Sequence, residues 1–468
     1  MSIRCINIDR DTPLFLPPDI REWVPQGHIA NYIMDAVGTI NPQKFSFNER
    51  GTGNRQYPPS MMLSLLIYCY SIGVFSGRKI EMLTHESVSV RVICAGTHPD
   101  HDTICAFRKQ NLELFAEVFV KVLELAKECR MLEVGNLVLS ADGTKIEGNA
   151  SKHKAVSYEH STKSIERLQA EVSQLIAKGQ EADATPLAEG LTVPDEIARR
   201  QDRIAALKLA QEKILQRKKQ GLEHERAEYH AAMEKRREAQ AAGKKLRGKA
   251  PVPPSEDPDP KAQYNFTDPE SRIMKASNGA HFVQAYNAQA VVETSSRLVV
   301  GARVCDRGND KQELCEDIES VPQDIRTGAT VLVDSGFMSQ KQVELVEGSV
   351  PEMLPTGVRV LAAVGKAKHG RSVEELEVRP DPPEPTPDAS FMEKMTHRVS
   401  TASGQAIYKL RKETVEPIFG NIKSVLGFRR FSMRGRAKAQ AEWFLVCAVT
   451  NLRRMFVLTT REKMAFAA

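Results

Sequence analysis

Hydrophobic positions recur at helical spacing through the first 135 residues of the chain. A segment from residue 58 to 70 starts with two prolines, which a first helical turn tolerates, and is apolar nearly all round, so it predicts a buried helix. The apolar positions between residues 112 and 129 predict a longer amphipathic helix. Shorter helices are expected over residues 28–37, 78–85 and 87–94.

A further helix is expected to begin at Asp102 or Thr103, either of which can cap it, and it carries Arg108 and Lys109. A short helix, a turn and a helix with a polar start and a basic end are compatible with a helix-turn-helix. In that case Arg108 and Lys109 would contact DNA. A purely architectural or dimerising helical domain has the same pattern, so both interpretations stay open.

Later in the chain, short β-branched runs predict strands. Two of them, starting at residues 137 and 330, lead into Asp142 and Asp334, and we expect each aspartate at the end of its strand. An aspartate beside glycine is also ordinary turn chemistry. Carboxylates that converge from separate elements can instead hold divalent metal ions. The remaining strands are expected over residues 281–293, 298–304 and 358–364, with helices over 310–319 and 339–347.

This order of elements favours an α/β (mixed α+β) fold with a mixed sheet and helices on its faces. Between the first and second strands, over residues 151–268, the strand pattern disappears. A narrow apolar seam, with a long charged segment over residues 195–242, predicts an inserted coiled-coil-like helical hairpin. It ends in a basic run at residues 243–249, which either contacts DNA or is a solvated helix end.

One later helical segment carries a third acid. Steps of four, four and seven residues place Tyr408, Lys412, Glu416 and Lys423 along one stripe of a helix. A carboxylate flanked by an aromatic ring and cations suits a site that holds a divalent metal beside a nucleic-acid phosphate. An exposed helix with an ordinary Lys412–Glu416 ion pair fits the same residues. Pro417 predicts a kink or a restart of the helix.

Composition changes this picture little, but the distribution of charge adds to it. The chain has 468 residues, 27% charged and 41% hydrophobic, which is typical of a soluble protein of two or three domains. A net charge of +5 permits nucleic-acid binding without demanding it. Arg429, Arg430 and Arg434 alternate with aromatic residues, which suits phosphate contact and base stacking. Basic residues also follow the last strand, at Lys366, Lys368, His369 and Arg371.

The eight cysteines contain no Cys-x-x-Cys pair, so we expect reduced thiols in a cytoplasmic protein and no structural zinc site. The N-terminus has no apolar signal core, and no apolar run reaches the about 18 residues that a membrane span needs. We therefore expect no membrane partner.

Taken together, these motifs resemble a known family. The chain resembles the DDE transposases of bacterial insertion sequences, in particular the group with a Tyr-x-x-Arg…Glu…Lys signature around the third acid. The spacing departs from the usual family arrangement in one respect, because four residues rather than three separate Arg411 from Glu416. Lys412 lies at the three-residue spacing, so either Arg411 or Lys412 could take the arginine's role. The matching stretches span nearly the whole chain, at residues 99–108, 141–146, 285–290, 333–337 and 408–423.

The resemblance implies a ribonuclease-H-like catalytic domain over residues 136–159 and 268–468. A helical DNA-binding or dimerisation domain would cover residues 1–135, and the hairpin with its Pro-rich linker residues 160–267. The resemblance also implies that Asp142, Asp334 and Glu416 bind two Mg²⁺ ions, which Mn²⁺ can replace, for DNA cleavage and strand transfer.

By the same resemblance, Tyr408 would pack beside the DNA, Arg411 or Lys412 would hold a phosphate, and Lys423 would contact the transposon end. The expected partners are the terminal inverted repeats and the target DNA, bound by a homodimer in the nucleoid of a bacterial cytoplasm. The alternative function is a catalytically lapsed, transposase-derived DNA-binding protein that acts as a repressor or architectural factor.

Overall fold

The chain forms two compact units, Met1–Ile146 with Asn287–Ala468, and Glu147–Tyr286. The predicted boundaries of three domains stay a prediction. The basic residues that follow the last strand, from Lys366 to Arg371, lie outside the described residues. The computed structural model describes residues 19–40, 56–180, 192–241, 243, 249–276, 279, 281–348, 357–365 and 380–467.

Helices make up the N-terminal part of the first unit, as the apolar spacing predicts. Asp100, rather than Asp102 or Thr103, caps the helix that carries Arg108, because this helix begins at His101 and the Asp100 carboxylate accepts from the Thr103 N–H at 2.7 Å. After a 3₁₀ turn, η1 (Ile20–Trp23), the helices are α1 (Ile29–Gly38), α2 (Pro59–Ser71), α3 (Gly77–Glu86), α4 (Val88–Ile93), α5 (His101–Gln110) and α6 (Leu112–Glu128).

A mixed sheet forms the centre of the first unit, which confirms the predicted mixed α/β class. Its strands follow the order β5-β1-β7-β8, and β6 pairs with β5. β7 runs parallel to both β1 and β8, whereas β6 runs antiparallel to β5. The bounds are β1 (Val138–Glu147), β5 (Phe282–Glu293), β6 (Val299–Cys305), β7 (Thr330–Val333) and β8 (Arg359–Ala362).

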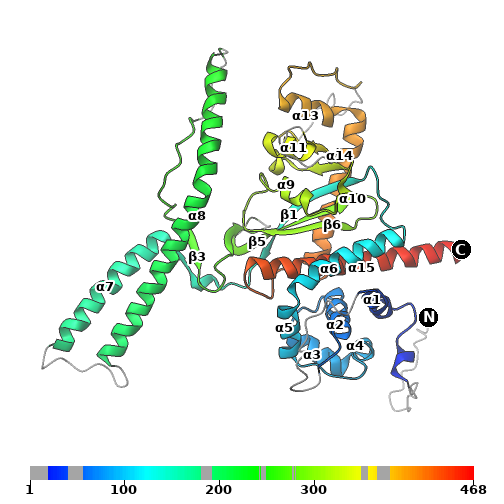
Figure 1. Cartoon of the computed structure of the whole chain (residues 1–468), viewed down its shortest axis with the longest axis horizontal. Helices are drawn as coiled ribbons and strands as arrows, with labels where there is room; N and C mark the ends of the chain where they lie inside the picture. Colours follow the sequence, from blue (N-terminus) through cyan, green and yellow to red (C-terminus); the bar gives the residue numbers. More distant parts are fainter. Residues whose placement is uncertain are drawn as a thin grey trace, which may run out of the picture. The chain divides into compact units, whose positions relative to one another are not determined.

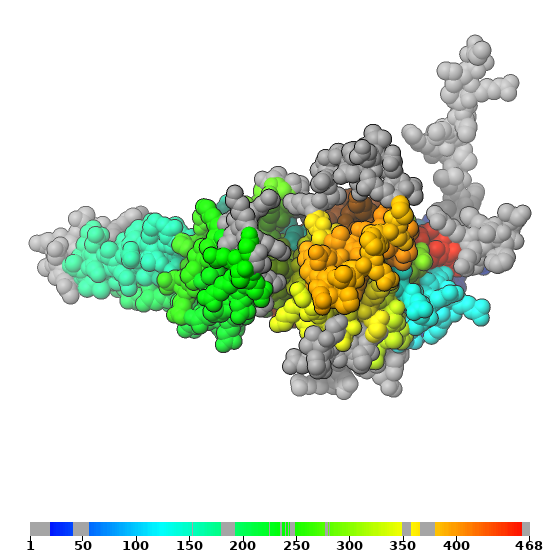
Figure 2. Space-filling model, turned by 90° about the horizontal axis from the view of Figure 1, so that it is seen from above, coloured from blue at the N-terminus to red at the C-terminus, as the bar shows by residue number. Residues whose placement is uncertain are grey.

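Helices pack around this sheet. α6 and α15 lie side by side (Figure 1), and the Trp443 indole on α15 is buried and donates to the Gln289 carbonyl on β5 at 2.8 Å. In Figure 2, α13 and α14 lie on the surface of the face shown. The elements after β6 are α9 (Leu314–Glu319), α10 (Gln323–Arg326), η4 (Ser335–Phe337), α11 (Gln340–Glu347), α13 (Phe391–Ser400), α14 (Ala402–Gly420), the π-helical η5 (Asn421–Val425) and α15 (Arg436–Ala467).

The second unit contains the predicted helical hairpin, α7 (Tyr158–Gln180) and α8 (Val193–Ala241) (Figure 1). Ile165 of α7 and Leu207 and Ile214 of α8 share a small apolar core, as the narrow seam predicts. The expectation of no strands in this stretch is wrong, because β2 (Ala155–Ser157) and β3 (Gln263–Asn265) pair antiparallel and contact the hairpin helices. Three residues are too few to show an alternating pattern. β4 (Arg272–Lys275) pairs with the first residues of β5.

No helix in the described parts of the chain is long and apolar enough to cross a membrane.

Candidate active site

Asp142 lies within β1 and not at its end, so the predicted strand end is wrong. Thr144 and Ile146 continue the strand as buried β-branched residues, which favour extended backbone. The Asp142 carboxylate is 21% exposed and accepts from the Gly143 N–H at 2.8 Å. Burial raises the pKa of Asp142 to about 6; the Gly143 hydrogen bond opposes this rise, and the charge of Asp334 adds to it.

Asp334 directly follows β7, as predicted, and its carboxylate caps η4 by accepting from the Gly336 N–H at 2.7 Å. The parallel pairing of β1 and β7 sets Ser140 opposite Leu332. Asp142 and Asp334 each follow that pair by two residues, so the strand register brings the two acids to the same level of neighbouring strands.

Glu416 lies on α14, whose first turn is capped by Thr401. The helix continues through Pro417 to Gly420, so the predicted restart does not occur. A proline removes only one backbone donor, and the surrounding helical hydrogen bonds hold the segment together. The Glu416 side chain is 59% exposed, in contrast to 21% for Asp142.

Arg411, one turn before Glu416 on α14, lies between two of the acids. Its guanidinium approaches Asp142 Oδ2 to 4.0 Å and Glu416 Oε1 to 3.8 Å, both longer than a hydrogen bond. The side chain is only 13% exposed, and its Nε has no hydrogen-bond partner in the described parts of the chain. Lys412, the other candidate for this role, is exposed to solvent.

Tyr408 ties α14 to the sheet. Its hydroxyl donates to the carbonyl of Val333, the residue before Asp334, at 2.9 Å. Burial raises the pKa of Tyr408, so the phenol keeps its proton for this bond. The Tyr408 bond and the Arg411 contacts therefore bring Asp142, Asp334 and Glu416 into one region.

Within the described residues, no group of three or more His, Cys, Asp and Glu side chains could hold a metal ion. The donor chemistry nevertheless fits Mg²⁺ or Mn²⁺, because carboxylate oxygens are the ligands these ions prefer. Metal loading would require the Arg411 guanidinium to leave its position between Asp142 and Glu416.

Basic side chains surround the end of α14. Lys423 lies in η5, where burial, together with the neighbouring charges of Arg429 and Lys145, lowers its pKa to about 8. Arg429, Arg430 and Arg434 are exposed.

The sequence pattern suggested base stacking by the aromatic residues beside these arginines, but the structure buries their rings. Phe428 and Phe431 are buried and pack edge to face, with ring centroids 5.6 Å apart, and Phe75 packs against Phe428 at 5.1 Å. Their apolar rings complete the core between the N-terminal helices and the C-terminal segment.

Arg108 is also buried, with 5% exposure, which argues against its predicted DNA contact. Its guanidinium donates to the Phe75 carbonyl at 2.9 Å and to the Tyr70 hydroxyl at 3.2 Å. Glu442 accepts from Tyr70 at 2.9 Å and from the Ser432 hydroxyl at 2.7 Å. We refer to these residues as the Arg108 network. Lys109, the next residue of α5, is exposed.

Sequence reasoning missed one acid beside the site. Asp310, between β6 and α9, accepts from the Asn287 amide at 2.7 Å and from the Gln289 amide at 2.6 Å, and its charge acts on Asp142. Asn287 and Gln289 belong to a stretch that the resemblance includes, but no spacing links Asp310 to them.

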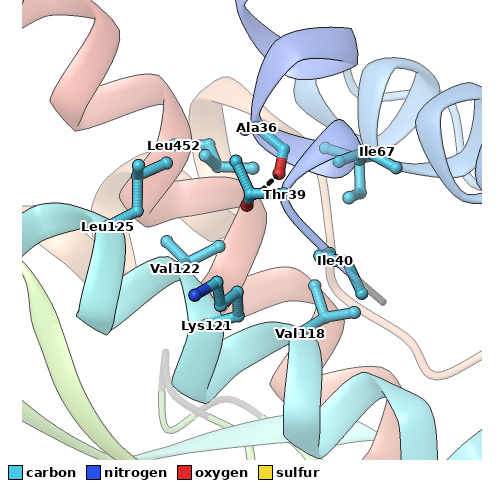
Figure 3. Close-up of a pocket in the computed structure, with 10 residues that line it drawn as sticks. Ala36, Thr39, Ile40, Ile67, Val118, Lys121, Val122, Leu125 and Leu452 are labelled. Atoms are coloured by element: carbon cyan, nitrogen blue, oxygen red, sulfur yellow. Dashed lines mark hydrogen bonds between the residues drawn. The ribbon is translucent and has the colours of Figure 1, made fainter. Parts of the chain in front are cut away.

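A separate pocket between α1, α2, α6 and α15 contributes nothing to this chemistry (Figure 3). Its lining is apolar apart from Thr39 and Lys121, and the Thr39 hydroxyl is already bonded to the Ala36 carbonyl at 2.8 Å.

Two family models match the chain. One, described as a transposase DDE domain, matches residues 384–456 and includes Glu416 and Lys423; the other, described as a transposase domain, matches residues 18–110. Asp142 and Asp334 lie outside both matches. Neither a curated protein nor a solved structure matches the chain.

Proposed function

Since the two family matches identify the chain as an insertion-sequence DDE transposase, we propose that it binds the terminal inverted repeats of its element and cleaves and transfers DNA strands. The reaction would be a metal-dependent, in-line phosphoryl transfer. The observation that carries this proposal is the strand register that aligns Asp142 with Asp334, together with the Arg411 contacts to Asp142 and Glu416.

The sheet supports a ribonuclease-H-like catalytic domain as part of the proposal. Its central β1 has the parallel strands β7 and β8 on one side and the antiparallel pair β5 and β6 on the other. Two acids on adjacent strands and a third on a following helix are the arrangement that such a domain would use.

Asp142, Asp334 and Glu416 would hold the metal ions. Two Mg²⁺ ions, or Mn²⁺ in their place, would supply an activated nucleophile and charge stabilisation at the leaving oxygen. Before loading, the Arg411 guanidinium partly neutralises Asp142 and Glu416, which would otherwise repel. Once released from them, it can bind a DNA phosphate with its fork of donors.

The exposed cations would contact the DNA backbone, which is the main source of affinity in such complexes. We assign this role to Lys423 in η5, which follows α14, and to exposed residues on the surrounding elements, and we leave the buried Arg108 out of it. The exposed residues are Lys109, Lys412, Arg429, Arg430 and Arg434. A homodimer that bridges two transposon ends, with target DNA as the acceptor, completes the proposal.

One observation favours the alternative, a DNA-binding descendant without catalysis. No three acids in the described residues are close enough to hold a metal, and a cation lies between Asp142 and Glu416.

The test is incubation of the purified protein with a labelled DNA end from its own element, in Mg²⁺ or in EDTA. Cleavage in Mg²⁺ alone is the expected result. Binding in both buffers without cleavage in either would establish the alternative function.

A further inference from the structure

Asn287, Gln289 and Asp310 form a buried polar cluster beside the proposed active site. Asn287 and Gln289 alternate along β5, so their side chains leave the same face of the strand. They are 0% and 1% exposed, and both amide nitrogens donate to one carboxylate oxygen of Asp310, at 2.7 and 2.6 Å. We call these three residues the Asp310 cluster.

The cluster contacts the backbone directly after Asp142. A Cβ atom at Gly143 would lie 2.5 Å from Gln289 Nε2, 2.6 Å from Asp310 Oδ1 and 2.8 Å from Asn287 Oδ1, closer than a side chain allows. A Cβ at this position would force these side chains to shift, so glycine serves the close approach here and not the turn that the sequence suggested. The three side chains press against the segment of β1 that carries Asp142.

Hydrogen bonds to residues outside the cluster hold it in place. The Gln289 carbonyl accepts from the Trp443 indole at 2.8 Å, and the Glu313 N–H donates to the Asp310 carbonyl at 3.1 Å. Glu313 in turn pairs with Arg303 of β6. Asp310 is thus anchored to both β5 and β6, and it can fix the position of Gly143.

The cluster is incompletely bonded. Asn287 Oδ1 and Gln289 Oε1 are buried, and neither has a hydrogen-bond partner among the described residues. Burying an acceptor without a donor costs about 1–3 kcal/mol, so a closed structural network would not leave two of them. Such unused acceptors beside the Asp142 segment are typical of a functional site rather than of a purely structural network.

We propose that Asp310 is a positioning residue of the proposed active site: with Asn287 and Gln289 it fixes the Asp142–Gly143 segment of β1 and so sets how tightly Asp142 holds a divalent cation. This inference rests on the proposed function.

The experiment measures binding of Mn²⁺ alone to the full chain, by the electron paramagnetic resonance signal of free Mn²⁺. Residues that orient metal ligands typically change metal affinity about 10–100-fold when they are removed. Asp310→Ala should therefore weaken Mn²⁺ binding by about that factor. Asp310→Asn, which keeps an acceptor for both amides, should recover most of the loss. Asp388→Ala removes an exposed carboxylate outside the cluster and should bind Mn²⁺ as the wild type does.

Thermal unfolding accompanies each titration. If Asp310→Ala does not fold, Gln289→Met replaces it as the test variant, because it removes one donor to Asp310 and keeps the side-chain volume. Weaker Mn²⁺ binding by the folded Gln289→Met variant supports the inference. Wild-type affinity in folded Asp310→Ala, or in Gln289→Met where that variant decides, overturns it and leaves the proposed function intact. A wild type that neither binds Mn²⁺ nor cleaves DNA overturns the proposed function as well.

Discussion

Arg108 and Arg411 are both arginines on helices, both were predicted to contact DNA, and both lie beside glutamate-containing clusters. In the Arg108 network, the guanidinium makes hydrogen bonds of 2.9 and 3.2 Å, and Glu442 is bonded at 2.7–2.9 Å. Around Arg411, the contacts to Asp142 and Glu416 are 4.0 and 3.8 Å, and Arg411 Nε has no partner within the described residues.

We interpret this difference as one between a structural cluster and the proposed functional one. A fully bonded buried network stabilises one arrangement and has no capacity left for a ligand. In the Arg411 region, by contrast, Arg411 Nε has no partner among the described residues and its guanidinium lies 3.8–4.0 Å from two acids. In the proposed function, these incompletely paired groups would take a metal ion and a phosphate. The Asp310 cluster, with its two unbonded amide oxygens, belongs with the second kind.

The largest expected effect is on the acids of the Arg411 region. Asp142→Asn and Asp334→Asn should each lower cleavage by on the order of a thousandfold or more, because each removes a proposed metal ligand, and both should still bind the transposon end. Gel-based cleavage and fluorescence anisotropy with the same labelled DNA measure the two properties. Full cleavage by either variant would show that the substituted residue is not part of the active site.

The Arg108 network should respond in stability instead. Arg108→Ala leaves the Tyr70 and Phe75 partners without their donor, and we expect a loss of about 3 kcal/mol in the free energy of unfolding. Lys109→Ala, at the neighbouring exposed position, should change that free energy by less than about 0.5 kcal/mol. Urea denaturation compares the two, and equal stability of Arg108→Ala and wild type would show that the network is not structural.

Removing Arg411 should separate metal binding from catalysis. Arg411→Ala frees Asp142 and Glu416 from the cation between them, so Mn²⁺ binding should tighten while cleavage falls by about tenfold or more through loss of the phosphate contact. Lys412→Ala should change neither quantity by more than about threefold, since its side chain is exposed. If Lys412→Ala has the larger effect on cleavage, the assignment of the arginine role to Arg411 is wrong.

The smallest effect concerns pH. Lys423 has a lowered pKa of about 8, so it is charged below that pH and loses its charge as the pH rises through it. DNA affinity should therefore fall a few-fold between pH 7 and 9, and in Lys423→Arg it should stay nearly constant because arginine keeps its charge. Anisotropy titrations across this range provide the measurement, and an equal pH dependence in both proteins would exclude Lys423 as its source.

Local sequence patterns predicted the helices and most of the strands, because a 3.6-residue or alternating period is visible within one element. The helix ending at Glu128 was placed to within a residue, and Asp334 was placed at its strand end. Asp142 was misplaced because Thr144 and Ile146 extend β1, and a glycine after an aspartate looks the same in a turn and in a close contact.

Long-range contacts could not be predicted in this way. Tyr70 and Glu442, which bury Arg108 between them, lie 372 positions apart, so no local pattern distinguishes Arg108 from a DNA-binding arginine. Asp310 is likewise joined to Asn287 and Gln289 only through the fold. The choice between Arg411 and Lys412 depended on which side of α14 faces β1, and a one-residue difference in spacing does not reveal that.

The most direct test of the account is metal-dependent cleavage per folded molecule in Glu416→Gln and Glu442→Gln, each compared with wild type. Both variants replace a helical glutamate by its amide, one in the Arg411 region and one in the Arg108 network. We predict that Glu416→Gln folds as wild type and loses cleavage, whereas Glu442→Gln loses stability and keeps its cleavage per folded molecule. Wild-type cleavage by Glu416→Gln would contradict the account.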